Sequence, residues 1–240
     1  MLSLEKQNAW RAQYQQRRPG WQPATELYAA WVRQQLRPGS RVLDLGCGRG
    51  GLVEQLAAEG LPLAQVVGID PDWHSLHEHR LRLPRAQAFS HPLPFAAASF
   101  DLIFASWLLE HLPRPGADLA EIARVLRPGG AFVFITPNKR HPLATLNRLF
   151  GRLGRWQGQL VARLYGRAAA DTFPTYYRAN TAGVLAQLAL AHGLALEQLA
   201  VVPDPTYLAF NAPLFRLACA VEERLPATWG VHLVGVLAVR

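Results

Sequence analysis

The chain has 240 residues, half of them hydrophobic, which suits one α/β domain with decorations and allows a sizeable core. The sequence contains no stretch of about 18 uncharged apolar residues, so we expect no membrane span, and the polar segment from Met1 to Trp10 is unlike a signal peptide. The cysteines, Cys47 and Cys219, lack the spacing of a metal site, so we expect a reduced, cytoplasmic protein.

Positive charge is concentrated in one part of the chain. The formal net charge is +8. Between Lys139 and Arg178 there are eight basic residues and one acid, Asp171, so this segment alone carries +7. Such an asymmetry indicates an anionic partner for the segment.

The first half of the chain predicts alternating strands and helices. Residues 1–37 are expected to be helical, with a break at Arg18-Pro19-Gly20. Apolar runs then predict strands at 41–45, 65–69, 85–89, 100–105 and 131–135. Helical periodicity falls between them, at 52–58, 72–81 and 117–126. This alternation of nearly continuous apolar strands with helices predicts a parallel sheet covered on both faces.

The rhythm changes after Pro137. We predict helices at 141–167, 181–192 and 207–224, and strands at 194–202 and 231–239. The chain is therefore expected to contain an N-terminal helical cap (1–37), a Rossmann-like core (38–138), a basic amphipathic lid (139–180) and a C-terminal part that completes the sheet (181–240).

A glycine-rich turn follows the first predicted strand, in Val42-Leu43-Asp44-Leu45-Gly46-Cys47-Gly48. Glycine permits positive φ and leaves room for a ligand against the main chain. The N-terminus of the following helix offers unpaired N–H groups to a negative group such as a carboxylate. The second strand ends at Asp70, where an acid can accept both hydroxyls of an adenosine ribose.

Two kinds of cofactor compete for this turn. Gly46, Gly48 and Gly51 satisfy the G-x-G-x-x-G pattern of dinucleotide sites, a weak signal alone. Asp44 argues against a dinucleotide, because its carboxylate would repel phosphates but would suit the ammonium and sulfonium of S-adenosylmethionine.

Ordered motifs between residues 39 and 138 resemble the class I S-adenosylmethionine-dependent methyltransferases. The first two are the segment from Val42 to Gly50 and Val67-Gly68-Ile69-Asp70. Three further motifs follow in order: the stretch around Leu93-Pro94-Phe95 and Ser99-Phe100-Asp101, then Glu110-His111-Leu112, and finally Leu126-Arg127-Pro128-Gly129-Gly130. The resemblance implies a doubly wound, mostly parallel seven-stranded α/β sheet with an antiparallel last strand, which agrees with the pattern at 231–239.

The resemblance also implies a set of cofactor contacts. Asp44, Gly46 and Gly48 would hold the methionine part, Asp70 the ribose, and the backbone of Ser90 the adenine. One position departs from the family, because Phe89 stands where an aspartate usually binds the adenine amine. Phe89 then packs on the ring, or Ser90 backbone or Gln87 makes the contact. The complete expected set is Asp44, Gly46, Cys47, Gly48, Asp70, Pro71, Phe89, Ser90, Ala105 and Ser106.

Histidine is the leading candidate for acid–base chemistry. His111 follows the fourth strand, beside the expected methyl donor, and can act near neutral pH; a structural or capping role is the alternative. His74, His77 and His79 share no metal-binding face and are interpreted as solvated, and no metal is expected. Tyr176 and Tyr177 are candidates for the acceptor pocket, and Trp21 and Thr25 of the N-terminal cap are weaker ones.

The acceptor is expected to be a small or lipid-like molecule, methylated at oxygen or carbon. We do not expect a nucleic-acid acceptor, because Ala105-Ser106-Trp107-Leu108 stands where related amide and adenine methyltransferases carry Asn/Asp-Pro-Pro-aromatic. In the predicted helix 141–167, arginines and leucines gather on opposite sides. We interpret it as a lid or as a contact with an anionic membrane face or a lipid-linked acceptor. The alternative functions are a nicotinamide-dependent oxidoreductase, or a non-catalytic binding module, which the departure at Phe89 motivates.

Overall fold

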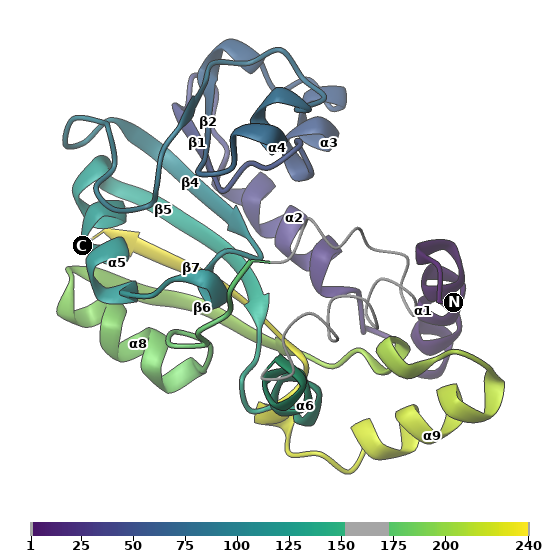
Figure 1. Ribbon diagram of the computed structural model, residues 1–240. Helices are drawn as coiled ribbons and strands as arrows, with labels where there is room; N and C mark the ends of the chain where they lie inside the picture. The colour runs from purple at the N-terminus through teal and green to yellow at the C-terminus, as the bar shows by residue number, and fades with distance from the viewer. Residues whose placement is uncertain (1, 152–172, 240) are drawn as a thin grey trace.

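A computed structural model describes residues 2–151 and 173–239, and within them a seven-stranded sheet forms the centre (Figure 1). Its strands are β1 (Val42–Leu45), β2 (Val66–Asp70), β3 (Arg85–Gln87), β4 (Phe100–Ser106), β5 (Leu126–Pro137), β6 (Leu194–Val202) and β7 (His232–Val239). The order across the sheet is β3-β2-β1-β4-β5-β7-β6. Pairings among β1 to β5 are parallel, and β7 is antiparallel to β5 and β6. The predicted fold class is therefore confirmed.

Helices surround this sheet. They are α1 (Leu4–Arg17), α2 (Ala24–Gln35), α3 (Leu52–Ala58), α4 (Trp73–His77), α5 (Pro115–Val125), α6 (Pro142–Gly151), α8 (Ala182–Ala191) and α9 (Ala212–Glu222). Short 3₁₀ turns are η1 (Leu63–Gln65), η2 (Leu109–His111), η4 (Pro205–Leu208) and η5 (Ala227–Trp229). The remainder of the helix predicted at 141–167 lies outside the described residues, and with it most of the arginines of the basic side.

Two predicted helices are shorter than expected. Instead of continuing to Leu81, α4 ends at His77, because the chain turns back and the Arg80 amide donates to the Arg49 carbonyl of the glycine turn at 3.0 Å. The helix predicted at 207–224 is divided into η4 and α9. Asn211 is the N-cap that starts α9, because its Oδ1 accepts a hydrogen bond from the Leu214 amide.

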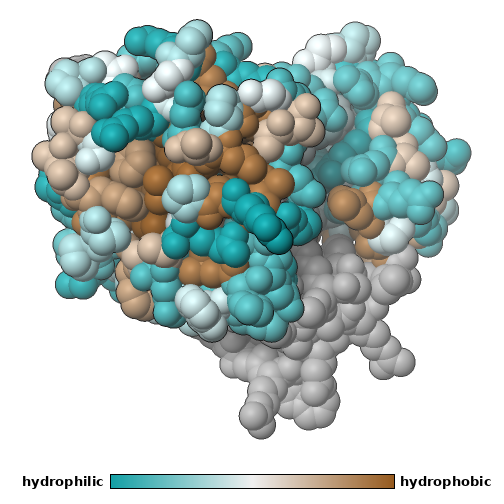
Figure 2. Space-filling view, turned by 90° about the horizontal axis from the view of Figure 1, so that it is seen from above, coloured by the Kyte–Doolittle hydropathy of each residue, from teal (hydrophilic) through white to brown (hydrophobic). Residues whose placement is uncertain are grey.

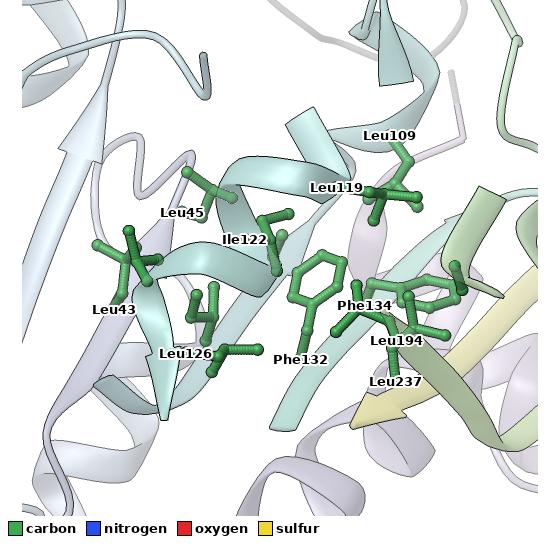
Figure 3. Close-up of a cluster of buried hydrophobic side chains, with 14 of the residues drawn as sticks. Leu43, Leu45, Leu109, Leu119, Ile122, Leu126, Phe132, Phe134, Leu194 and Leu237 are labelled. Atoms are coloured by element: carbon green, nitrogen blue, oxygen red, sulfur yellow. The ribbon is translucent and has the colours of Figure 1, made fainter. Parts of the chain in front are cut away.

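Both faces of the sheet are covered by helices, as predicted. On one face, α5 and α8 pack onto leucines and phenylalanines of β1, β5 and β7 (Figure 3). On the other, α2 and α3 pack on the alternate side chains of the same strands. The core residues labelled in Figure 3 are Leu43, Leu45, Leu109, Leu119, Ile122, Leu126, Phe132, Phe134, Leu194 and Leu237. This double layer holds the strand ends in fixed positions.

A smaller lobe joins residues from opposite ends of the chain. Tyr14 of α1 packs with Phe215 and Cys219 of α9, and Trp10 stacks on Phe215 with ring centroids 4.6 Å apart. Seen from above, this lobe lies beside the larger one that holds the sheet (Figure 2). The arrowheads of β4 and β5 point toward the side on which α1 and α9 lie (Figure 1). The carboxyl ends of the parallel strands, where ligands bind in open α/β sheets, therefore face this side.

None of the helices in residues 2–151 and 173–239 is long and apolar enough to cross a membrane.

Candidate functional site

The glycine turn after β1 is held against the end of β2. Gly46 and Gly48 have φ values of +77° and +50°, a conformation that side chains disfavour. The amides of Gly46 and Cys47 both donate to the Ile69 carbonyl, at 2.9 and 3.0 Å. A Cβ at Gly46 would lie 3.3 Å from the Leu108 side chain. The turn thus requires glycine at Gly46 both for its backbone conformation and for its neighbour.

Asp70 joins the two predicted cofactor motifs. Its Oδ2 accepts a hydrogen bond from the Gly48 amide at 2.9 Å, and its Oδ1 accepts one from the Asp72 amide, beyond Pro71, at 2.8 Å. Burial raises the pKa of the Asp70 carboxyl, although both hydrogen bonds oppose that shift. Each oxygen has a further lone pair for a ligand hydroxyl.

Asp44 is a buried carboxylate without a counter-ion among the described residues. It is 5% exposed, and burial, followed by repulsion from Asp70, raises its pKa well above the usual range. Tyr28 of α2 is a nearby group that sequence reasoning missed. Its buried hydroxyl has no hydrogen-bond partner among the described residues, and burial and the charge of Asp44 raise its pKa. Such a site fits a ligand that brings a cation, as an ammonium or sulfonium would.

The expected adenine region lies beyond β3. The Phe89 ring is 71% exposed, whereas the Ser90 hydroxyl donates to Asp118 Oδ1 at 2.6 Å. The Gln87 side-chain amide donates to the Pro71 carbonyl at 2.9 Å. An exposed aromatic face is therefore available at Phe89, whereas the Gln87 side chain already donates to a backbone carbonyl of the turn after β2.

The expected residues at the end of β4 are placed on the same edge of the sheet as the glycine turn. Ala105 is fully buried and Ser106 is half-buried. Cys47, by contrast, turns its thiol toward the sheet, because a Cβ on Gly68 would lie 2.9 Å from its Sγ. Any contact of Cys47 with a cofactor would therefore use its backbone.

His111 lies in η2 with a defined tautomer. Its Nδ1 is 2.8 Å from the Pro174 carbonyl oxygen, which can only accept, so Nδ1 carries the proton and Nε2 keeps its lone pair. Burial lowers the pKa of the imidazole. The side chain is 27% exposed, so Nε2 of a neutral His111 is a proton acceptor within reach of a ligand.

Glu110 is a second titratable group that sequence reasoning missed. Its carboxylate is buried and accepts from Thr136 Oγ1 at 2.9 Å, and Thr136 in turn accepts from Asn180 Nδ2 at 2.6 Å. Burial raises its pKa to about 7. Its Oε1 is 4.0 Å from His111 Nε2. The sequence signal that indicates Glu110 is its position directly before His111 in the motif Glu110-His111-Leu112.

The two predicted tyrosines lie against this pair. The amides of Tyr176 and Tyr177 donate to the Glu110 carbonyl at 2.7 and 3.2 Å. Tyr176 is 43% exposed with the guanidinium of Arg178 over its ring, whereas Tyr177 is buried. The structure thus brings His111 and both tyrosines together, with Tyr176 the one whose side chain a ligand can reach.

The other sequence candidates have different settings. Trp21 belongs to the smaller lobe, where its indole N–H donates to the Pro203 carbonyl at 2.7 Å and its ring meets Tyr14 edge-on. Thr25 is exposed on α2. The interpretation of His74, His77 and His79 as solvated is wrong for His79, which lies just beyond α4. It is buried because its ring packs beneath Gly50 and its Nδ1 accepts from the Leu81 amide.

Comparisons with known proteins identify the class that this fold and site define. The family model described as a methyltransferase domain matches residues 43–134. A ubiquinone biosynthesis O-methyltransferase of Thiobacillus denitrificans is 32% identical over 169 residues, 67% of each chain. The chain belongs to the class I S-adenosylmethionine-dependent methyltransferase family, as the resemblance indicated. The cofactor of that family is the predicted one, and the comparisons favour it over the nicotinamide alternative.

Other similar proteins cover this chain, or are covered by it, to different extents. A trans-aconitate 2-methyltransferase of Azoarcus sp. is 35% identical over 146 residues, 60% of this chain and 55% of that protein. A chain of the complex between the Haloferax volcanii Trm112 methyltransferase activator and a methyltransferase has the same fold, with a TM-score of 0.61, 20% identity and coverage of 98% and 96%. The first curated relatives that the chain matches are covered over only 31%, 45% and 50% of their length.

Proposed function

We propose that this chain transfers a methyl group from S-adenosylmethionine to a hydroxyl group of a small or lipid-like acceptor. The observation that carries the proposal is Asp44, a buried carboxylate with no counter-ion in the described residues, beside a glycine turn at the carboxyl edge of the sheet. A cationic cofactor would compensate this charge, whereas a dinucleotide phosphate would add to the repulsion.

The residues that would hold the cofactor follow the predicted set. Asp44 and the backbone of Gly46, Cys47 and Gly48 would bind the methionine end. The Tyr28 hydroxyl would donate a hydrogen bond there. Asp70, with Pro71 after it, would bind the ribose, Phe89 and Ser90 the adenine, and Ala105 and Ser106 would border the amino-acid end. When bound, S-adenosylmethionine supplies a methyl group on a sulfonium that is already a good leaving group.

The chain's own residues would orient the acceptor and receive its proton. Orientation alone can contribute ~7–11 kcal/mol to such a reaction. A hydroxyl must also lose its proton, and His111 Nε2 is the acceptor we assign, because Nδ1–H is fixed on Pro174. An ionised Glu110, 4.0 Å away, would stabilise the resulting imidazolium. Tyr176 and Tyr177 would border the acceptor, with Trp21 on the side of the smaller lobe.

A lipid-like acceptor, or a peripheral contact with an anionic membrane, would account for the basic segment. The segment from Lys139 to Arg178 carries +7 in total, and Lys139, Arg140 and Arg178, at its two ends, lie within the described residues. Arginines near an anionic surface attract it electrostatically. The relatives' names point to different acceptors, so this part of the proposal rests on charge alone.

Calorimetric titration tests the cofactor assignment. We expect S-adenosylhomocysteine to bind with one site per chain and NADH not to bind. Binding of NADH without S-adenosylhomocysteine would reject the proposal in favour of an oxidoreductase. Binding of S-adenosylhomocysteine with no methyl transfer to any acceptor would favour a binding module.

A further inference from the structure

We propose that Tyr207, His232 and Trp107 form the wall that recognises the acceptor, and that this wall selects a planar, uncharged hydroxy-arene. The proposal rests on the proposed function, because it concerns the acceptor of the same site.

His232 stands at the carboxyl edge of the sheet. It is the first residue of β7 and pairs with Pro137, the last residue of β5, and with Val202, the last residue of β6. Val234 and Val236, on the same side of the strand by alternation, belong to the core that α2 covers. The imidazole therefore lies at the edge that carries the cofactor motifs, on the α2 face, whereas Glu110 and Thr136 lie toward the α5 face.

Tyr207 and His232 form an uncharged pair. The Tyr207 hydroxyl is 2.9 Å from His232 Nε2, and the two rings meet edge-on. His232 is 3% exposed, and its Nδ1 has no hydrogen-bond partner in the part of the chain that the structure describes. Burial lowers the pKa of His232 to about 4, so the imidazole is neutral near pH 7. The pair can therefore exchange hydrogen bonds but offers no charge.

Trp107 connects this pair to the cofactor side of the site. It directly follows Ser106 and takes a φ of +57°, a conformation that is a genuine outlier for a bulky side chain. Its amide donates to the Ile135 carbonyl at 3.0 Å, and its ring centroid is 5.1 Å from that of His232. Strain of this kind is retained where the surroundings fix it, often at functional sites. Here the strained backbone after β4 turns the indole of Trp107 toward His232.

A buried polar network fixes the loop that carries Tyr207. Asp204 Oδ1 accepts from the Thr206 amide at 3.0 Å and from its hydroxyl at 2.6 Å, while Arg11 donates to Oδ2 at 2.8 and 3.1 Å. Trp21 binds the neighbouring Pro203 carbonyl. Tyr207 follows Thr206 directly, so the network holds its backbone in one geometry. The guanidinium of Arg11, which reaches this loop from α1, is paired with Asp204 and therefore offers no free charge to an anionic acceptor.

The chemistry of the wall defines its ligand. An indole face favours a planar ring, which it can stack against. A neutral hydroxyl beside it favours a group that donates or accepts one hydrogen bond, and a carboxylate placed there would lose its hydration without gaining a cation. A hydroxy-arene satisfies both conditions, and one of its hydroxyls can then face His111.

Calorimetry on the full chain saturated with S-adenosylhomocysteine tests the selection, with catechol as the probe. Benzoate keeps the ring but adds a charge, and cis-1,2-cyclohexanediol keeps the hydroxyls but loses planarity. We expect catechol to bind at least tenfold more tightly than either. Equal binding of all three, tighter binding of benzoate, or no catechol binding would overturn the proposal. Failure of S-adenosylhomocysteine itself to bind would instead reject the proposed function.

Variants test the named residues. Tyr207→Phe should weaken catechol binding about tenfold, as expected for the loss of one hydrogen bond, and should leave S-adenosylhomocysteine affinity unchanged. Trp229→Phe, at an exposed aromatic residue on η5, is the matched control and should change neither. His232→Phe should weaken catechol binding as much as Tyr207→Phe, with no further loss in the double variant, and His232→Gln should restore part of the affinity. Wild-type catechol affinity in Tyr207→Phe, or additive losses in the double variant, would show that the pair does not recognise the acceptor.

Discussion

The carboxylate of Asp70, at the end of β2, accepts the backbone amide of Gly48, in the turn after β1, at 2.9 Å. A single side chain thus fixes the glycine turn and also presents free lone pairs at the carboxyl edge of the sheet. The second and first motifs of the family are therefore one structural unit, and loss of Asp70 affects both.

Removing this carboxylate should weaken cofactor binding. Asp70→Ala is expected to cost ~1.5–3 kcal/mol in S-adenosylhomocysteine binding, because a charged hydrogen-bonding partner is lost. Isothermal titration measures the change. Asp101→Ala, which removes a carboxylate paired with Arg127 elsewhere on the sheet, is the control and should bind normally. A folded Asp70→Ala protein with wild-type affinity would refute the ribose assignment.

Asp44 should oppose stability in the ligand-free protein. Its pKa is raised on folding, so the folded state holds its proton more tightly than the unfolded state. Stability from this group is therefore present below its unfolded pKa of about 4 and is lost as the pH rises toward the raised folded value. Asp44→Asn avoids that loss.

The comparison of Asp44→Asn with wild type is made by thermal unfolding between pH 4 and 8. We expect the melting temperature of the variant to exceed that of wild type by a margin that grows as the pH rises, while S-adenosylhomocysteine binding is abolished. A margin that shrinks with rising pH would contradict the sign of the shift, and retained binding would remove Asp44 from the cofactor site.

The proposal that His111 accepts the proton of the acceptor hydroxyl predicts a slower methyl transfer in a His111 variant and a defined pH profile in the wild type. His111→Gln should lower methyl transfer to catechol by ~10²–10⁴ with unchanged S-adenosylhomocysteine affinity. In the wild type, the rate should fall only below the usual histidine value of 6.5, because burial lowers the pKa of His111. His77→Gln, at an exposed residue of α4, serves as control. A wild-type rate in His111→Gln at saturating acceptor would leave this histidine with a structural role.

The basic segment predicts binding to anionic vesicles. Bases near an anionic surface contribute ~1 kcal/mol each before salt screening. We expect the protein to co-sediment with anionic but not neutral vesicles at low salt. Replacing Arg148, Arg152, Arg155 and Arg163 together by Gln should abolish this without affecting S-adenosylhomocysteine binding. Equal sedimentation with both vesicle types would reject an electrostatic contact.

The buried ion pair between Arg11 and Asp204 should contribute more to stability than an exposed ion pair does. Arg11→Ala leaves Asp204, which is 1% exposed, without its cation, and is expected to destabilise the protein by ~3–5 kcal/mol. Arg18→Ala breaks the exposed pair with Glu223, whose side chains are each 48% exposed, and should cost less than about 1 kcal/mol. Chemical denaturation measures both. Equal losses would mean that Asp204 is compensated by other groups.

Sequence reasoning predicted the sheet well because its strands are local apolar runs. The bounds of α3 and β6 agree with prediction, and the antiparallel last strand is confirmed. The sequence also indicated that the glycine turn and Asp70 lie at the same edge of the sheet, because the turn directly follows one strand of the parallel sheet and Asp70 ends the next. By contrast, the Glu110–Thr136–Asn180 network and the Tyr207–His232 pair join residues far apart in the sequence, and no periodicity reports which polar side chains meet. His79 was misjudged for the same reason, since the glycine turn that covers it lies in another element.

The pairing of α1 with α9 has a consequence for the order in which the molecule forms. Tyr14 and Phe215, which share the core of the smaller lobe, are separated by about 200 residues of chain. At a synthesis rate of roughly 5–20 residues per second, α1 waits roughly 10–40 s on the ribosome before its partner exists. The strands β1 to β5 lie entirely within that interval and can pair in the meantime. The strands that carry the cofactor motifs can thus pair early in translation, whereas the smaller lobe is completed only after α9 has been made, shortly before β7.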